Sequence, residues 1–198
     1  AETRAEVEWV KSLYPSANHY LDVYDRADLI HNRSVLGHCI YLHDKEWKLL
    51  AKRQARIAHC PSSNFFLGSG IFNAHRARQE NILFALGSDV GAGTSLSMLD
   101  TAGDAYLASA LNGHPLTPAE LFYLITAGGA AVLHCDSTLG NFSCGKEADF
   151  IEILAPENDI PPKATTPAHD PLAALFHLAI TKQGSRAVNS VYIKGVKQ

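Results

Sequence analysis

Short apolar runs alternate with helical segments through the middle of this sequence, and this alternation restricts the fold more than any other feature. Each run has the length of a buried β-strand, and a segment with helical spacing follows it. Such alternation is typical of parallel strands with covering helices, an α/β fold. Three units cannot close an eight-stranded barrel, so they form either part of a barrel or an open sheet. The predicted strands are Ser34–Gly37, Arg56–Ala58 and Ile82–Gly87.

The helical segments begin and end at recognisable signals. We expect Asp44 to cap one helix, Thr117-Pro-Ala-Glu120 to form a capping box that opens another, and Asn112-Gly113 to close a third. Phe65–Gly70 is predicted to be a loop. The predicted helices are Ala1–Leu13, Tyr20–Leu29, Asp44–Gln54, Phe72–Glu80, Ser97–Leu111 and Thr117–Leu133.

The pattern changes after Cys135, which suggests two parts, residues 1–135 and 136–198. Ala148–Leu154 and Val188–Lys194 alternate as strands with one solvated face do. Ala155–Pro171 is rich in proline and is predicted to be a loop, and Leu172–Lys182 is predicted to be an apolar helix. We therefore expect a small β unit after the parallel part.

Charge and composition argue against several classes of function. The net charge is −3 and no basic stripe is present, which argues against nucleic-acid binding. No run of about 18 apolar residues occurs, so no membrane-spanning segment is predicted. None of the 4 cysteines forms a C-x-x-C pair. We expect reduced thiols in a cytoplasmic protein.

Polar residues follow each predicted strand of the parallel part. His38, His59 and Asp89 come at or just after the strand ends. Because such ends lie on one face of a parallel sheet, two imidazoles and a carboxylate would meet there, as in a metal or acid–base site. Each residue also has a structural explanation: either histidine could be a satisfied core residue, and Asp89 a turn residue.

Several segments together resemble the guanine deaminases of the amidohydrolase superfamily. The resemblance covers nearly all of the 198 residues. Its pieces are Glu2-Thr-Arg-Ala-Glu-Val, Tyr20–Asp25, Val35-Leu-Gly-His-Cys-Ile-Tyr-Leu42, Ala58-His-Cys-Pro-Ser-Ser-Asn64 with Leu67-Gly-Ser-Gly70, Leu86-Gly-Ser-Asp-Val-Gly-Ala-Gly93, Ser97–Asp100 and Gly140–Asp149.

The resemblance implies the C-terminal part of a (β/α)8 metal-dependent hydrolase barrel over residues 1–135, with residues 136–198 contributing strands to a small β domain. It implies hydrolysis of guanine to xanthine and ammonia, with zinc (or iron) as cofactor, and a homodimer at full length. Asp89 matches a metal ligand, Glu2 the proton-shuttling carboxylate, and His38 the histidine that stabilises developing charge. Glu2 and Asp89 would also contact the purine. His59 matches no ligand position.

One departure from the family pattern concerns the metal ligands. The chain has no H-x-H pair, and the family's strand-five histidine would fall two residues before Ala1. Because a catalytic zinc needs about three protein ligands, we expect the chain alone to hold little metal and to be inactive. Two other readings stay open: another amidohydrolase, such as a triazine chlorohydrolase or an adenosine-type deaminase, and a non-catalytic fragment.

Overall fold

Three parallel strands form the central sheet of this protein, whose computed structural model describes residues 1–154 and 170–198. The strands are β1 (Val35–Gly37), β2 (Arg56–His59) and β3 (Phe84–Leu86), in the order β1-β2-β3. Ile57 is the register partner of Leu36 on one side and of Phe84 on the other. The predicted α/β alternation is therefore confirmed, and all three strand ends lie on one edge.

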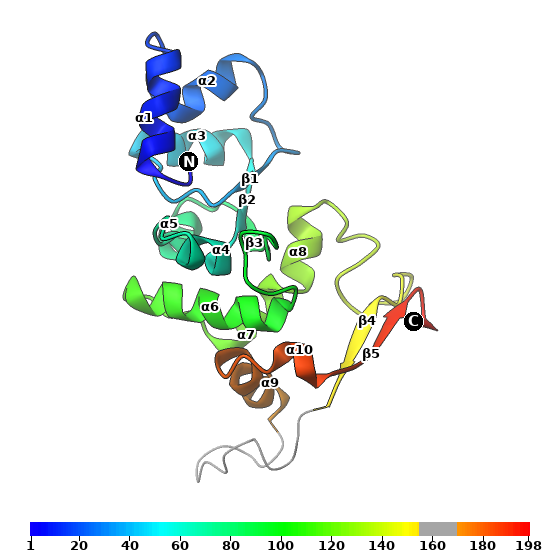
Figure 1. Ribbon diagram of the computed structural model, residues 1–198. Coiled ribbons are helices and arrows are strands. Elements are labelled where there is room, and N and C mark those ends of the chain that lie inside the picture. Colours follow the sequence, from blue (N-terminus) through cyan, green and yellow to red (C-terminus); the bar gives the residue numbers. More distant parts are fainter. Residues whose placement is uncertain (155–169) are drawn as a thin grey trace.

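Helices precede and follow these strands along the chain (Figure 1). Their limits agree with the predictions to within a few residues for most of them. The helices of this part are α1 (Arg4–Leu13), α2 (Tyr20–Arg26), α3 (Asp44–Arg53), α4 (Pro61–Phe66), α5 (Ala74–Gln79), α6 (Met98–Leu111), α7 (Pro118–Leu124) and α8 (Ala127–Val132).

The core lies between the parallel sheet and its helices. Phe72 is fully buried, stacks edge-on against Phe84 with ring centroids 5.5 Å apart, and faces Trp47 of α3 at 6.1 Å. Leu50 and Ile57 are also fully buried. Burying each of these large side chains stabilises the fold by about 1.5–3 kcal/mol. The packing fixes the strand ends, where the polar residues lie.

A second, antiparallel sheet lies apart from the parallel sheet in Figure 1. It has the order β4-β5-β6, with β4 (Phe150–Ile153), β5 (Val188–Ile193) and β6 (Val196–Lys197). The predicted loop Ala155–Pro171 lies almost wholly outside the described residues. The two sheets agree with a division near residue 135, although the boundary itself stays a prediction.

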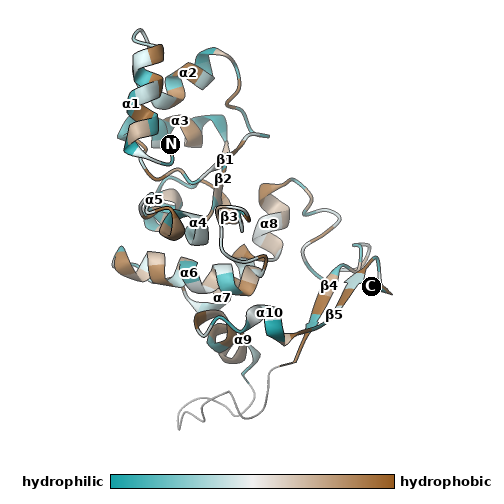
Figure 2. Ribbon diagram, viewed as in Figure 1, coloured by the Kyte–Doolittle hydropathy of each residue, from teal (hydrophilic) through white to brown (hydrophobic). Residues whose placement is uncertain are grey.

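Two more helices lie along the chain between β4 and β5, α9 (Pro171–Ile180) and α10 (Gly184–Ala187). α9 packs against α6 and α7, and Figure 2 shows it largely in the colour of hydrophobic residues. Gly103 of α6 makes this packing close, because a Cβ there would lie 2.2 Å from the carbonyl oxygen of Ala179. Among the helices of the described residues, none is long and apolar enough to cross a membrane.

Three local predictions were wrong. His43, not Asp44, caps α3, and His43 and Glu46 form a complete capping box. Part of the predicted loop Phe65–Gly70 belongs to α4, which has a proline in its first turn. The predicted helix Thr117–Leu133 breaks at Thr126 (φ −129°, ψ −103°) into α7 and α8. The short strand β6 was not predicted.

Candidate active site

His38 lies immediately after β1 and is fixed on both its backbone and its ring. Its backbone is left-handed (φ 61°), a conformation that a non-glycine residue rarely adopts and that often occurs at functional sites. Its N–H donates to the carbonyl of Ala58 in β2. Its Nδ1 lies 2.8 Å from Oδ1 of Asn64, a buried residue of α4. Nδ1 therefore donates to Asn64, and Nε2 faces the opposite side.

Asp89 follows β3 on a tight glycine-containing loop. It is also left-handed (φ 48°), and its side chain is 40% exposed. Gly93 allows the loop to close, because a Cβ there would lie 1.8 Å from the carbonyl oxygen of Ser88. The loop thus holds a partly exposed carboxylate just after the carboxyl end of the buried strand β3, as predicted from the sequence.

Glu2 reaches the same place from the residues just before α1. The carbonyl of Ala1 accepts a hydrogen bond of 2.9 Å from the N–H of Ile40, which ties this segment to the one following β1. Oε2 of Glu2 lies 3.7 Å from Nε2 of His38, and Oδ2 of Asp89 lies 3.8 Å from the same nitrogen. The structure therefore brings together Glu2, His38 and Asp89, the three site residues predicted from the sequence.

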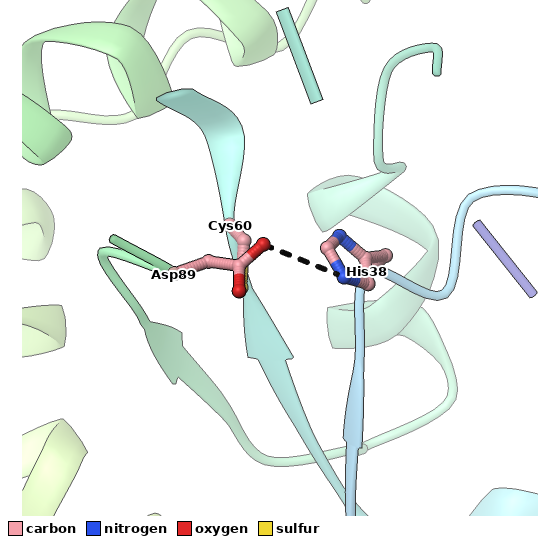
Figure 3. A group of neighbouring side chains, drawn as sticks. All are labelled: His38, Cys60 and Asp89. Carbon is pink, nitrogen blue, oxygen red and sulfur yellow. Dashed lines mark ion pairs between the residues drawn. The ribbon is translucent and has the colours of Figure 1, made fainter. Parts of the chain in front are cut away.

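Cys60 is a member of this group that the sequence did not single out. Its sulfur, a ring nitrogen of His38 and a carboxylate oxygen of Asp89 all lie within 4.8 Å of one another (Figure 3). Burial first, and then the charge of Asp89, raise the pKa of the Cys60 thiol to about 11. The sulfur is consequently a neutral thiol beside the site. One indication of its role was present in the sequence: Cys60 directly follows His59, at the end of a predicted strand.

The donor atoms of this group fit a divalent metal at Asp89. Zinc accepts carboxylate oxygen and imidazole nitrogen as ligands, and the Asp89 side chain is partly exposed. His38 already uses Nδ1 and presents only Nε2. With the Cys60 thiol neutral, this group offers Asp89 and Nε2 of His38, so a catalytic zinc, which takes about three protein ligands, would need a further ligand from outside the group.

His59 belongs to the core. It is 1% exposed, and its ring lies 4.7 Å from that of Phe72. Burial, with a smaller effect from the charge of His38, lowers the pKa of His59 to about 3. The side chain is thus neutral near pH 7. Of the two histidines at the strand ends, only His38 contacts Asp89 and Glu2 among the described residues.

A comparison with protein-family models relates this geometry to a known group of enzymes. The amidohydrolase family model matches residues 1–197. The chain belongs to the amidohydrolase family. Its parallel sheet with covering helices is accordingly part of a barrel-type amidohydrolase domain.

Curated relatives of this amidohydrolase chain include guanine deaminases. The enzyme from Escherichia coli (strain K12) is 47% identical over 150 residues, which are 76% of this chain and 34% of the relative. That from Dictyostelium discoideum is 38% identical over 205 aligned positions, covering 100% of this chain and 45% of the relative. The chain thus spans less than half the length of these relatives.

Solved structures show the same similarity in three dimensions. E. coli guanine deaminase matches with a TM-score of 0.90 and 38% identity, covering 100% of this chain and 46% of that one. A C. acetobutylicum guanine deaminase with bound guanine matches with a TM-score of 0.85 and 28% identity, covering 99% of this chain and 46% of that one. An adenosine deaminase from Xanthomonas campestris with bound zinc matches with a TM-score of 0.85 and 28% identity, covering 99% of this chain and 43% of that one.

Proposed function

We propose that the full-length protein containing this chain hydrolyses guanine to xanthine and ammonia. The observation that carries this proposal is the convergence of Glu2 and Asp89 on Nε2 of His38, at 3.7 and 3.8 Å, from three separate segments of the chain. Two carboxylates and an imidazole at one point provide the proton-transfer groups that a hydrolytic deamination needs. The identity to guanine deaminases supports guanine as the substrate.

The same proposal includes a metal ion held in part by Asp89. Zinc is the first choice, because a similar amidohydrolase structure carries it, and iron is the alternative. By the family resemblance, an H-x-H pair and one more histidine outside this sequence would complete the ligand set. When bound, the metal supplies a water molecule whose pKa is lowered toward neutrality.

Each of the three side chains then has a separate task. Asp89 accepts a proton from the attacking water at a carboxylate oxygen. Glu2, protonated at the start, delivers its proton to the ring nitrogen of the purine. It then takes the proton of the new hydroxyl at the attacked carbon and passes it to the departing amine, and the proton held by Asp89 returns to Glu2 at the end of the cycle. His38, whose ring is held by Asn64 at Nδ1, donates from Nε2 in its protonated form to the oxygen that gains charge at the attacked carbon. Ammonia leaves as the carbon–nitrogen bond breaks.

We extend the proposal to the organisation of the full-length protein. Residues 1–135 would be the second half of the (β/α)8 barrel, and residues 136–198 would contribute to its small β domain. The β4–β5–β6 sheet supports this division, because it shares no strand with the parallel sheet. We also propose a homodimer in the cytoplasm, on the family resemblance alone.

A substrate panel tests the proposed activity. Purified full-length protein is supplied with guanine, adenosine and a chlorotriazine, and ammonia and chloride release are measured. We expect ammonia and xanthine from guanine, and much slower release from the other two compounds. Turnover of adenosine in preference to guanine would contradict the proposal and favour an adenosine-type deaminase, which the zinc-containing Xanthomonas match makes the second candidate.

The panel also separates the remaining readings. Chloride release from the chlorotriazine, without ammonia from guanine, would indicate a triazine chlorohydrolase that uses the same core residues. No turnover of any of these compounds, in protein with a full complement of metal, would favour a non-catalytic role. Either result would overturn guanine deamination as the function.

A further inference from the structure

The segment from Pro61 to Gly70 carries two buried polar side chains that contact two of the three proposed site residues, His38 and Glu2. Asn64 is 1% exposed and accepts from His38, as described above. Ser69 is 4% exposed, and its hydroxyl donates to Oε1 of Glu2 at 2.7 Å. We propose that Ser69 is a positioning residue for the Glu2 carboxylate. The inference rests on the proposed function and adds a residue to it.

The Ser69 hydrogen bond selects which oxygen of Glu2 can carry the transferred proton. Oε1 accepts from Ser69, so a proton on that oxygen would compete with the bond. Oε2 is the oxygen that faces His38. The arrangement therefore directs a transferred proton to Oε2, the oxygen on the side of His38 and Asp89. Without Ser69 the carboxylate is free to rotate, and both oxygens become equivalent.

Hydrogen bonds hold the backbone of Ser69 in place, so its hydroxyl can orient the Glu2 carboxylate. Its N–H donates to the carbonyl of Asn64 at 2.9 Å, and its own carbonyl accepts from the Tyr41 hydroxyl at 2.8 Å. Gly70 then turns with φ 136°, and a Cβ there would lie 2.9 Å from both Ile40 and Tyr41. The hydroxyl of Ser69 is thus presented from a backbone that has little room to move.

The backbone of Glu2 is fixed independently of its carboxylate. Its N–H donates to Oε2 of Glu6 at 2.8 Å, and Tyr20 donates to the other oxygen of Glu6 at 2.5 Å. Burial alone would raise the pKa of Glu6, but the hydrogen bonds from Tyr20 and Glu2 outweigh it and lower that pKa below its usual value. Glu6 therefore stays an acceptor for the Glu2 backbone. Loss of Ser69 should release only the side chain of Glu2.

Kinetics of Ser69→Ala in the full-length protein test this role. We expect kcat for guanine to fall about tenfold to a hundredfold, because misplaced general acid–base groups lose much of their contribution. KM should change by less than about twofold, because the lost interaction acts on proton transfer. Ser63→Ala is the matched control. Ser63 is buried in the same segment, but its hydroxyl has no hydrogen-bond partner among the described residues, so kcat should be unchanged.

A double-mutant cycle with Glu2→Gln separates positioning from a general structural effect. If Ser69 acts through Glu2, adding Ser69→Ala to Glu2→Gln should cause little further loss of kcat. Equal losses in both backgrounds would overturn the proposal, as would an unchanged kcat in Ser69→Ala alone.

A crystal structure of full-length Ser69→Ala decides the question without reference to activity. We expect the Glu2 carboxylate to turn away from Nε2 of His38 while the Glu2 backbone stays in place. An unmoved carboxylate would overturn the role of Ser69, even in an active enzyme. A rotated carboxylate in a protein that does not act on guanine would instead leave the positioning role intact and refute the proposed function.

Discussion

His59 illustrates how a strand-end histidine can serve the core. Its neutral ring is enclosed with Phe72, and its folded-state pKa of about 3 lies well below the usual value of about 6.5. The unfolded chain therefore binds more protons between these two values. The stability that His59 contributes is fully present above about pH 6.5 and is lost as the pH falls toward 3.

This pH dependence leads to a first prediction, made for His59→Leu. Between pH 6.5 and 5, the free energy of unfolding of the unaltered protein should fall with a slope approaching about 1.4 kcal/mol per pH unit from this residue. His59→Leu should remove most of that slope, whereas His31→Leu, at an exposed position, should retain it. Urea unfolding at several pH values provides the measurement. Equal slopes in all three proteins would show that His59 is not buried in neutral form.

The site residues differ in how readily the sequence identified them. Asp89 and His38 follow predicted strands, so their meeting could be predicted from parallel topology alone. Glu2 was assigned only through the family resemblance. Cys60 and Ser69 were missed because their roles depend on side-chain direction and on contacts between segments distant in sequence, such as the bond from Ser69 to Glu2. Neither spacing nor composition carries that information.

A buried carboxylate joins α6 to α10 and to the loop that follows Asp89. Asp100 is 6% exposed. It accepts hydrogen bonds of 3.0 Å from the Ser95 hydroxyl and from the N–H of Gly184. Its carbonyl also accepts from Lys182 at 2.7 Å. The C-terminal helices are thereby attached to the loop that carries Asp89, the proposed metal ligand.

Asp100→Ala should therefore destabilise the protein. We expect a loss of about 2–3 kcal/mol in the free energy of unfolding, because buried donors lose their acceptor. Asp136→Ala, at an exposed position after α8, should change it by less than about 0.5 kcal/mol. Urea denaturation compares the two. A loss at Asp100 no larger than that at Asp136 would show that the attachment contributes nothing to stability.

The glycine loop after β3 makes a separate prediction. An alanine at Gly93 would place its Cβ 1.8 Å from the Ser88 carbonyl, so the loop must open and displace Asp89. We expect Gly93→Ala to weaken zinc binding by the full-length protein about tenfold or more. Gly129→Ala is the control, since a Cβ there meets no atom within 4 Å. Competition with a chelator gives both affinities. Equal affinities would show that Gly93 does not control Asp89.

The elements themselves were predictable where periodicity and caps agreed. The strand–helix alternation and the Thr117–Glu120 capping box are confirmed. The break between α7 and α8 was not predicted because the apolar pattern continues through it. At the break, the Thr126 hydroxyl donates a hydrogen bond to the Phe122 carbonyl near the end of α7. α4 was missed because a short segment of proline, serine and asparagine has no helical periodicity.

The site residues that this chain supplies determine what it can do alone. The parallel sheet places His38 and Asp89 at a single edge, Glu2 joins them from the residues before α1, and the chain carries no H-x-H pair. We predict that the isolated 198-residue chain holds well under one zinc per molecule and releases no ammonia from guanine. Metal analysis and an ammonia assay on the same sample measure both. Stoichiometric zinc with turnover would contradict this prediction.

The most direct test of the account is xanthine formation by the full-length protein and by two isosteric variants, Glu2→Gln and Asp89→Asn. Each variant removes a carboxylate charge and leaves the side-chain shape. We expect unaltered protein to convert guanine to xanthine, and each variant to lose at least about a hundredfold in kcat, the usual contribution of a general acid or base. Near-normal xanthine formation by either variant would show that the residue at that position does not carry the chemistry proposed for it.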